Sequence, residues 1–142
     1  MSNEAVNTNE EWVIEELAEI DLKDDRLNKR CQEIARALGE QPMAPINQAC
    51  EDWADTKAAY RFFDNPKVTP EKITEPHRQR TVERMKEYDI VLAVQDTTFF
   101  NYTHHPKTEG LGEIGNKKQN QRGFGMHSTL AVAPIGTPLG LL

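Results

Sequence analysis

One carboxylate of this sequence is placed where a β-sheet would hold it rigidly. Ile90 to Val94 are five apolar residues in a row, and Gln95-Asp96-Thr97-Thr98 follow them directly. A short apolar run of this kind is typical of a strand that is buried on both faces. Asp96 would then lie at the end of a rigid element, which suits a metal ligand or a general base. The alternative is that Asp96 starts a turn and caps a nearby backbone N–H.

A group of basic residues is placed on a predicted helix. Asp24 and Asp25 stand where an N-cap and a first-turn acid belong, and we predict that the helix stops at Gly39. The basic side chains that lie largely off its apolar face are Arg26, Lys29, Arg30 and Arg36. They either contact DNA phosphates or form an ordinary solvated helix face.

A further helix is predicted from Asp55, as its N-cap, to Phe63. Lys57 and Arg61 are one turn apart in this helix, so their side chains project together. The pair is therefore a better candidate for contact with DNA than the neighbouring aromatic residues. Phe62 and Phe63 are predicted to be buried in the core.

The negative charge of the sequence is concentrated at its start. The net charge is −6, but residues 1–25 hold nine acids and a single base, Lys23. The rest of the sequence carries 16 bases and 14 acids, a net charge of +2. A near-neutral body of this kind can still carry local basic stripes that bind phosphate, whereas the acidic start would repel it.

Composition indicates a globular domain rather than a membrane or secreted protein. The sequence has 142 residues, of which 37% are hydrophobic and 28% charged. Its longest apolar run is far shorter than a membrane span, and residues 1–11 do not resemble a signal peptide, so we expect a cytoplasmic location. Cys31 and Cys50 have neither CxxC spacing nor a histidine at metal-site spacing, so free thiols are expected.

The remaining elements favour an α+β fold. The other predicted helices cover residues 10–20 and 46–53, and a longer one starts at Thr69-Pro70-Glu71 and is kinked or restarted at Pro76. The predicted strands cover residues 90–94, with an extended continuation to 103, then 123–133 and 139–142. Residues 104–121 are predicted to be a long surface loop. The short turn at 134–138 makes the last two strands antiparallel.

The last predicted strand runs up to Leu142, where the sequence stops. Three strands preceded by helices leave at least one face of the sheet uncovered, although a buried sheet needs a second layer. We expect the sequence to be the front part of a larger protein, or a remnant of one. The alternative is a small α+β domain whose last strand packs on the helices.

Five stretches of the sequence resemble a known family, in the same order. They are residues 22–30 (LKDDRLNKR), 56–65 (TKAAYRFFDN), 94–98 (VQDTT), 110–115 (GLGEIG) and 127–130 (HSTL). Together they closely resemble the N-terminal part of bacterial insertion-sequence transposases, which are cut-and-paste enzymes of the DDE class. The resemblance extends over nearly the whole sequence from about residue 12.

The resemblance implies a division into two domains. Residues 10–70 are expected to form a helical domain that binds transposon-end DNA, and residues 71–142 to open a ribonuclease-H-like catalytic domain with mainly antiparallel strands. Residues 1–9 are polar and are expected to be disordered on that ground. In that family the acid matched by Asp96 is the first of three carboxylates that hold two Mg²⁺ or Mn²⁺ ions for phosphodiester hydrolysis and transesterification. The second aspartate and the glutamate are expected beyond Leu142, so the polypeptide alone should be inactive.

The same resemblance implies double-stranded DNA as the partner, at the inverted-repeat ends and close to the nucleoid. Full-length transposase or a second copy on DNA are further expected partners. The residues expected to contact the ends are Arg26, Lys29, Arg30, Lys57, Tyr60 and Arg61. Three further cations, Lys117, Lys118 and Arg122, either touch DNA near the cleavage site or belong to a solvated loop.

Three other interpretations stay open. In the first, the polypeptide is a non-catalytic regulator of transposition that binds DNA or forms hetero-oligomers. In the second, it is a remnant without function. The third, a hydrolytic metal site of His104, His105 and Asp96, is disfavoured because adjacent residues of a strand point to opposite sides.

Overall fold

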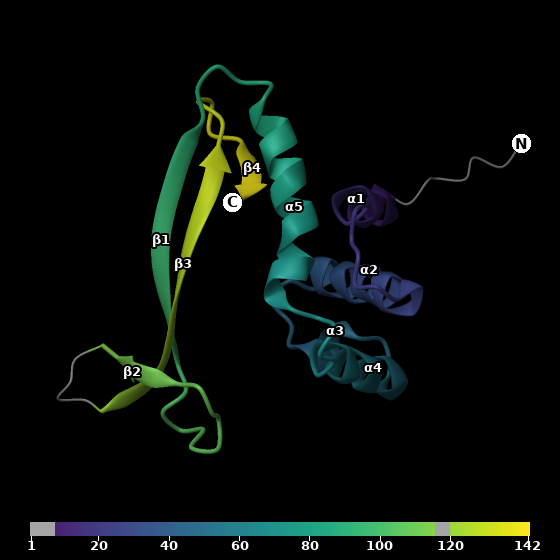
Figure 1. Ribbon diagram of the computed structural model, residues 1–142, viewed down its shortest axis with the longest axis vertical. Helices are drawn as coiled ribbons and strands as arrows, with labels where there is room; N and C mark the ends of the chain where they lie inside the picture. Colours follow the sequence, from purple (N-terminus) through teal and green to yellow (C-terminus); the bar gives the residue numbers. More distant parts are fainter. Residues whose placement is uncertain (1–7, 116–119) are drawn as a thin grey trace, which may run out of the picture. The chain divides into compact units, whose positions relative to one another are not determined.

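The computed structural model describes residues 8–115 and 120–142, which form two compact units that divide after Arg80. The first unit is helical, and the second is dominated by a long ribbon of two strands (Figure 1). The helices are α1 (Thr8–Glu16), α2 (Asp25–Glu40), α3 (Ile46–Ala49), α4 (Trp53–Phe63) and α5 (Pro70–Met85). The strands are β1 (Leu92–Asn101), β2 (Gly112–Ile114), β3 (Gln121–Val132) and β4 (Pro138–Leu141). This arrangement confirms the predicted α+β class, with helices first and antiparallel strands after them.

The domain boundary predicted at residues 70 and 71 falls at the start of α5. That helix continues past Arg80, so its last turn belongs to the second unit. The division into functional domains stays a prediction. The disorder predicted for residues 1–9 falls mostly on residues 1–7, which are outside the described residues.

The core of the helical unit is built around α2, which contacts α1, α3 and α4. Val13, Leu17 and Ile20 are buried, and their spacing is that of one apolar face of the helix predicted over residues 10–20. Helix α1 itself ends at Glu16, earlier than predicted, and a turn carries the next two of these side chains into the core. The other members of the buried cluster are Leu22, Cys31, Ile34, Ala59 and Phe62.

Helix α2 begins as predicted and ends differently. The Asp24 carboxylate accepts the Arg26 backbone N–H at 3.0 Å, the expected N-cap. The helix does not stop at Gly39 but continues to Glu40. A Cβ atom at Gly39 would lie 2.6 Å from the ring of Trp12. Glycine therefore lets the indole approach the helix at this position, and it does not provide a left-handed cap.

Helix α4 is capped by Asp52, not by Asp55 as predicted. Asp52 has an extended backbone and its carboxylate accepts the Asp55 backbone N–H at 2.8 Å. Asp55 is thus the third residue of the helix, where its charge is stabilised by the helix dipole. The aromatic prediction is half right, because Phe62 is 2% exposed and Phe63 is 44% exposed. Adjacent residues point about 100° apart around a helix, so a single apolar face holds only one of them.

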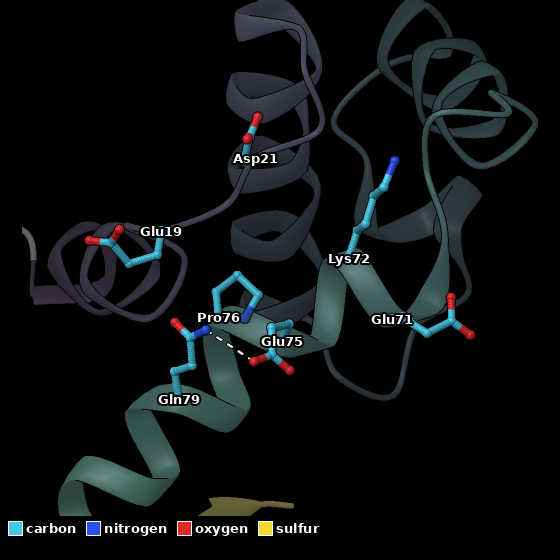
Figure 2. A pocket seen from close by; sticks show the side chains of 7 residues that line it. All are labelled: Glu19, Asp21, Glu71, Lys72, Glu75, Pro76 and Gln79. Atoms are coloured by element: carbon cyan, nitrogen blue, oxygen red, sulfur yellow. Dashed lines mark hydrogen bonds between the residues drawn. The ribbon is translucent and has the colours of Figure 1, made fainter.

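Helix α5 passes through Pro76 without restarting. Thr69 caps it through a 3.4 Å hydrogen bond from the Lys72 backbone N–H, as its position predicted. Thr74, which would cap a helix restarted at Pro76, instead donates its hydroxyl to the Pro70 carbonyl at 2.9 Å and lies inside the helix. Pro76 is buried, and the ribbon bends beside it (Figure 2).

The four-stranded sheet is antiparallel throughout. Strand β3 pairs with β1 along ten residues and also with β2 and β4, which confirms the antiparallel pairing predicted for the last two strands. Strand β2 was missed, because residues 104–121 were predicted to be a loop. Its three residues, Gly112 to Ile114, are too few to show an alternating pattern in the sequence.

Strand β1 is not buried on both faces, contrary to prediction. Leu92 and Val94 are about half exposed. Among the described strands β1 pairs with β3 alone, so it lies at an edge of the described sheet. The packed core of this unit consists of Ala131, Ala133 and Leu139, against which Met85, Tyr88 and Val91 lie. Within the part of the chain that the structure describes, no layer covers the apolar run of β1.

Both cysteines are free thiols, as predicted. Cys31 is buried in the helical core, and burial raises the pKa of its thiol to about 11. Because the folded state favours the neutral thiol, this contribution to stability is complete below the unfolded pKa of about 8.5 and is lost as pH rises toward 11.

Cys31 should therefore resist alkylation. At pH 8 its thiolate population is about two orders of magnitude below that of an ordinary thiol. We expect iodoacetamide to label the half-buried Cys50 first, as measured by peptide mass spectrometry over time. In urea both thiols should react at similar rates. Equal rates in the folded protein would contradict the burial of Cys31.

Candidate nucleic-acid interface

The predicted DNA-contacting cations of α2 lie beside carboxylates. Arg26 is the most exposed of them, with 93% of its side chain accessible, and its Nε is 3.5 Å from the Asp24 carboxylate. Lys29 Nζ lies 3.8 Å from Glu33 Oε1, one turn along the helix. Ion pairs this exposed are weak, so both cations remain available to a phosphate.

Arg30 differs from its neighbours because it connects two helices. Its Nη1 lies 3.1 Å from Glu33 Oε2 on α2 and donates a 3.2 Å hydrogen bond to Asp55 Oδ1 on α4. About a third of the side chain is exposed. Sequence reasoning did not indicate the partner on α4, because the two residues are far apart along the chain.

Helix α4 presents a basic and aromatic face. Lys57 and Arg61 are exposed and one turn apart, as predicted. Lys57 Nζ lies 5.2 Å from the ring centre of Trp53, and Trp53 and Tyr60 are 67% and 50% exposed. The helical period places all four side chains within one stripe. Sequence reasoning missed Trp53, although its spacing of four residues from Lys57 was a usable signal.

A further cation reaches the start of α2 from the turn after α4. Lys67 Nζ lies 3.8 Å from Asp24 Oδ2, and Lys72 donates to the Lys67 carbonyl at 3.0 Å. The Arg26 backbone N–H, the largest influence, holds the pKa of Asp24 below its ordinary value, with smaller contributions from the charges of Arg26 and Lys67. Asp24 thus stays ionised at neutral pH and offsets part of the positive charge that gathers there.

A hollow of about 350 Å³ between the α1–α2 connection and α5 is acidic (Figure 2). Its lining residues are Glu19, Asp21, Glu71, Lys72, Glu75, Pro76 and Gln79. Glu75 accepts hydrogen bonds from Gln79 at 3.0 Å and from Arg78 at 2.7 Å, and the Arg78 hydrogen bond, followed by that of Gln79, keeps the pKa of Glu75 low. Four carboxylates against one lysine make this hollow unfavourable for a phosphate backbone.

Asp96 lies within β1 and not at its end, which corrects the predicted position. The strand continues to Asn101, and Asp96 is paired with Ser128 of β3, so it does not start a turn. The carboxylate is exposed. Thr97 lies on the opposite face and shares a 2.7 Å hydrogen bond with His127. Within residues 8–115 and 120–142, no three His, Cys, Asp or Glu side chains lie close enough to hold a metal ion, and this holds for Asp96 with His104 and His105.

The three predicted cations of the second unit are only partly described. Arg122 lies in β3, opposite Glu113 of β2, and not in a loop as predicted. Its Nη2 donates to the Leu111 carbonyl at 3.5 Å. Lys117 and Lys118 lie outside the described residues, so the prediction for them is unchanged.

A bundle of short helices with exposed cations on α2 and α4 defines the first unit as a helical domain suited to bind DNA. Residues 9–68 match the protein family described as Transposase DNA-binding. These residues, which span most of α1 and all of α2, α3 and α4, are therefore a transposase DNA-binding domain. The match covers less than half of the chain, and it confirms the resemblance for this part. No helix of the two described segments has the length and apolar character needed to cross a membrane.

Proposed function

We propose that the chain binds the duplex DNA of transposon ends through its helical unit. The observation that carries this proposal is the match of residues 9–68 to the Transposase DNA-binding family. The exposed cations of α2 and α4 support it, because phosphate contacts from lysine and arginine supply most of the affinity for duplex DNA. We assign phosphate contact to Arg26, Lys29, Lys57 and Arg61, and a weaker contact to Tyr60. Arg122, with Lys117 and Lys118, would add contacts near a cleavage site.

We further propose that β1 contributes Asp96 as one ligand of a Mg²⁺ or Mn²⁺ site for DNA cleavage and strand transfer. A carboxylate on a paired strand is the oxygen donor that such hard cations prefer, and the strand fixes its direction. Two-metal sites of this type polarise the attacking and leaving oxygens of a phosphodiester when the ions are bound. Among the described residues no three His, Cys, Asp or Glu side chains gather at Asp96, so we derive no cleavage step from them.

DNA binding is tested by titrating a fluorescent duplex with the 142-residue polypeptide at several salt concentrations. The four phosphate contacts assigned to α2 and α4 predict that log K falls against log salt with a slope of about −3.6, and contacts from Arg122, Lys117 and Lys118 would make it steeper. Titration of a random-sequence duplex gives the non-specific affinity. Titration of duplexes enriched from a randomised library gives the specific affinity. Absence of binding to every duplex at low salt would overturn the proposal.

The polypeptide alone should not cleave DNA. A single carboxylate cannot hold two ions in a defined geometry, so purified residues 1–142 should leave supercoiled plasmid intact in Mg²⁺ or Mn²⁺. The Asp96→Ala variant is the control for contaminating nucleases, because it should behave identically. Metal-dependent nicking that disappears in this variant would show that the polypeptide completes a catalytic site.

A second candidate function is regulation of transposition by competition. The match to the Transposase DNA-binding family covers residues 9–68, so this role would use the helical unit and no catalytic site. In this role the polypeptide would occupy ends, or pair on DNA with a second copy or with full-length transposase. A gel-shift assay in which the polypeptide displaces a complete transposase from its ends without cleaving them would support this function.

A further inference from the structure

We infer that Glu33 and Asp55 position Arg30 to recognise the edge of a guanine base, and that they disfavour its contact with phosphate. The inference rests on the proposed DNA-binding function and specifies what one residue of that interface reads. Arg26 and Lys29 each have one acidic partner at 3.5 Å or more, whereas Arg30 has two at 3.1 and 3.2 Å.

The two carboxylates fix the guanidinium from different directions. Glu33 approaches Nη1 from the same helix, and Asp55 approaches it from the first turn of α4. The position of Asp55 is itself fixed, because its backbone N–H is held by the Asp52 cap. An arginine held at one nitrogen from two helices loses much of its rotational freedom before any ligand binds, so less is lost on binding.

The rest of the guanidinium is left for a ligand. Within the described part of the chain, Nε and Nη2 of Arg30 make no hydrogen bond, and neither of them is among the buried polar atoms without a partner. These two nitrogens form a planar fork of N–H donors. A fork of this type matches the O6 and N7 acceptors of guanine in the major groove, and it also matches two phosphate oxygens.

The surrounding charge decides between these two ligands. Arg30 and its two carboxylate partners together carry a formal charge of −1. Lys29 also pairs with Glu33, and adding its charge raises the sum only to zero. A phosphate approaching the fork would meet two carboxylates within a few ångströms and would be repelled. The guanine edge is neutral and has only acceptors there, so it gains the two hydrogen bonds without this repulsion. Arg30 is therefore assigned to a base, and the more exposed cations to phosphates.

The first test uses the wild-type polypeptide and chemically altered DNA. The probe is a duplex enriched by the protein from a randomised library, in which each enriched guanine is replaced in turn by 7-deazaguanine, which lacks the N7 acceptor. One replacement should weaken wild-type binding about tenfold. The same replacement should change the binding of Arg30→Lys less than twofold, because a lysine keeps the charge but has no fork.

The second test removes the carboxylates. The double variant combines Glu33→Gln with Asp55→Asn. Its affinity for scrambled duplex should rise about tenfold, and its affinity for the enriched duplex should rise less. Discrimination, the ratio of the two affinities, should therefore fall. The matched control is Glu75→Gln, which neutralises a similarly exposed carboxylate paired with an arginine three residues away. It should leave discrimination unchanged. Thermal unfolding measured in parallel detects a merely structural effect, which would lower the melting temperature without changing discrimination.

Three results would overturn the inference while leaving the proposed function intact. They are an enriched duplex without any required guanine, equal sensitivity of wild type and Arg30→Lys to 7-deazaguanine, and unchanged discrimination in the double variant. Failure of the wild-type polypeptide to bind any duplex would instead overturn the proposed function itself.

Discussion

Phe62→Ala should unfold the helical unit. Phe62 is 2% exposed and belongs to the buried cluster that joins α1, α2 and α4. Removing a buried phenylalanine ring costs about 3–5 kcal/mol, through lost transfer energy and the cavity that remains. Since small domains are stable by only about 5–15 kcal/mol, this loss consumes much or all of the free energy of unfolding. Circular dichroism during urea titration should show an early or absent helical transition.

The adjacent residue provides the matched control. Phe63 carries the same ring, lies 5.3 Å from Phe62 in an edge-to-face contact, and is 44% exposed. Phe63→Ala should cost about 1 kcal/mol, because little surface is taken from the core. Equal losses for the two variants would contradict the orientation of α4. If both variants remain folded, a duplex titration shows whether the exposed ring of Phe63 contributes to DNA binding.

Removing three exposed cations should have the largest effect on DNA affinity. The variant combines Arg26→Ala on α2 with Lys57→Ala and Arg61→Ala on α4. Each phosphate contact contributes about one decade of affinity near 0.1 M salt, through the counterions that it releases. We therefore expect a loss of about a hundredfold to a thousandfold. The slope of log K against log salt should become shallower by about 2.7, roughly 0.9 for each lost contact.

A second triple variant separates contact from net charge. Arg78, Lys86 and Lys107 are exposed cations that belong to neither α2 nor α4, and their replacement by alanine removes the same charge. This variant should lose less than tenfold in affinity and should keep the wild-type slope within about one unit. The assignment of the α2 and α4 cations fails if the two triple variants weaken binding equally. Thermal melts should show that both remain folded, since surface substitutions usually change stability by about 0.5 kcal/mol or less.

These measurements bear on how an acidic chain binds an acidic ligand. The net charge of the sequence is −6, and carboxylates accompany the cations of α2 at every position assigned to DNA. Such partners lower the affinity for any polyanion, so they reduce non-specific binding along with specific binding. Base contacts then provide a larger share of the discrimination between sequences.

The sequence by itself determined the features that depend on neighbouring residues. The Asp24 and Thr69 caps are local hydrogen bonds to the next turn, so the order of residue types was enough to predict them. The burial of Val13, Leu17 and Ile20 was indicated by their apolar spacing along the sequence, although α1 itself ends at Glu16. The turn at 134–138 is too short for anything but an antiparallel connection. The short motifs at residues 22–30 and 56–65 likewise indicated the transposase DNA-binding domain by their residues and order alone.

Only the tertiary structure decided which distant groups meet. The pairing of Arg30 with Asp55, and that of Lys67 with Asp24, depends on how α2 and α4 pack. The approach of Trp12 to Gly39 likewise required the packing of α1 on α2.

Burial was the other property that local sequence did not determine. An apolar run predicts a strand, but whether its faces are covered depends on layers supplied from elsewhere, and β1 has none among the described residues. Periodicity reports the backbone repeat of one element, whereas contacts between elements are set by the shapes and volumes that pack together. For this reason the cations of the interface could be named from the sequence, but their carboxylate partners on other elements could not.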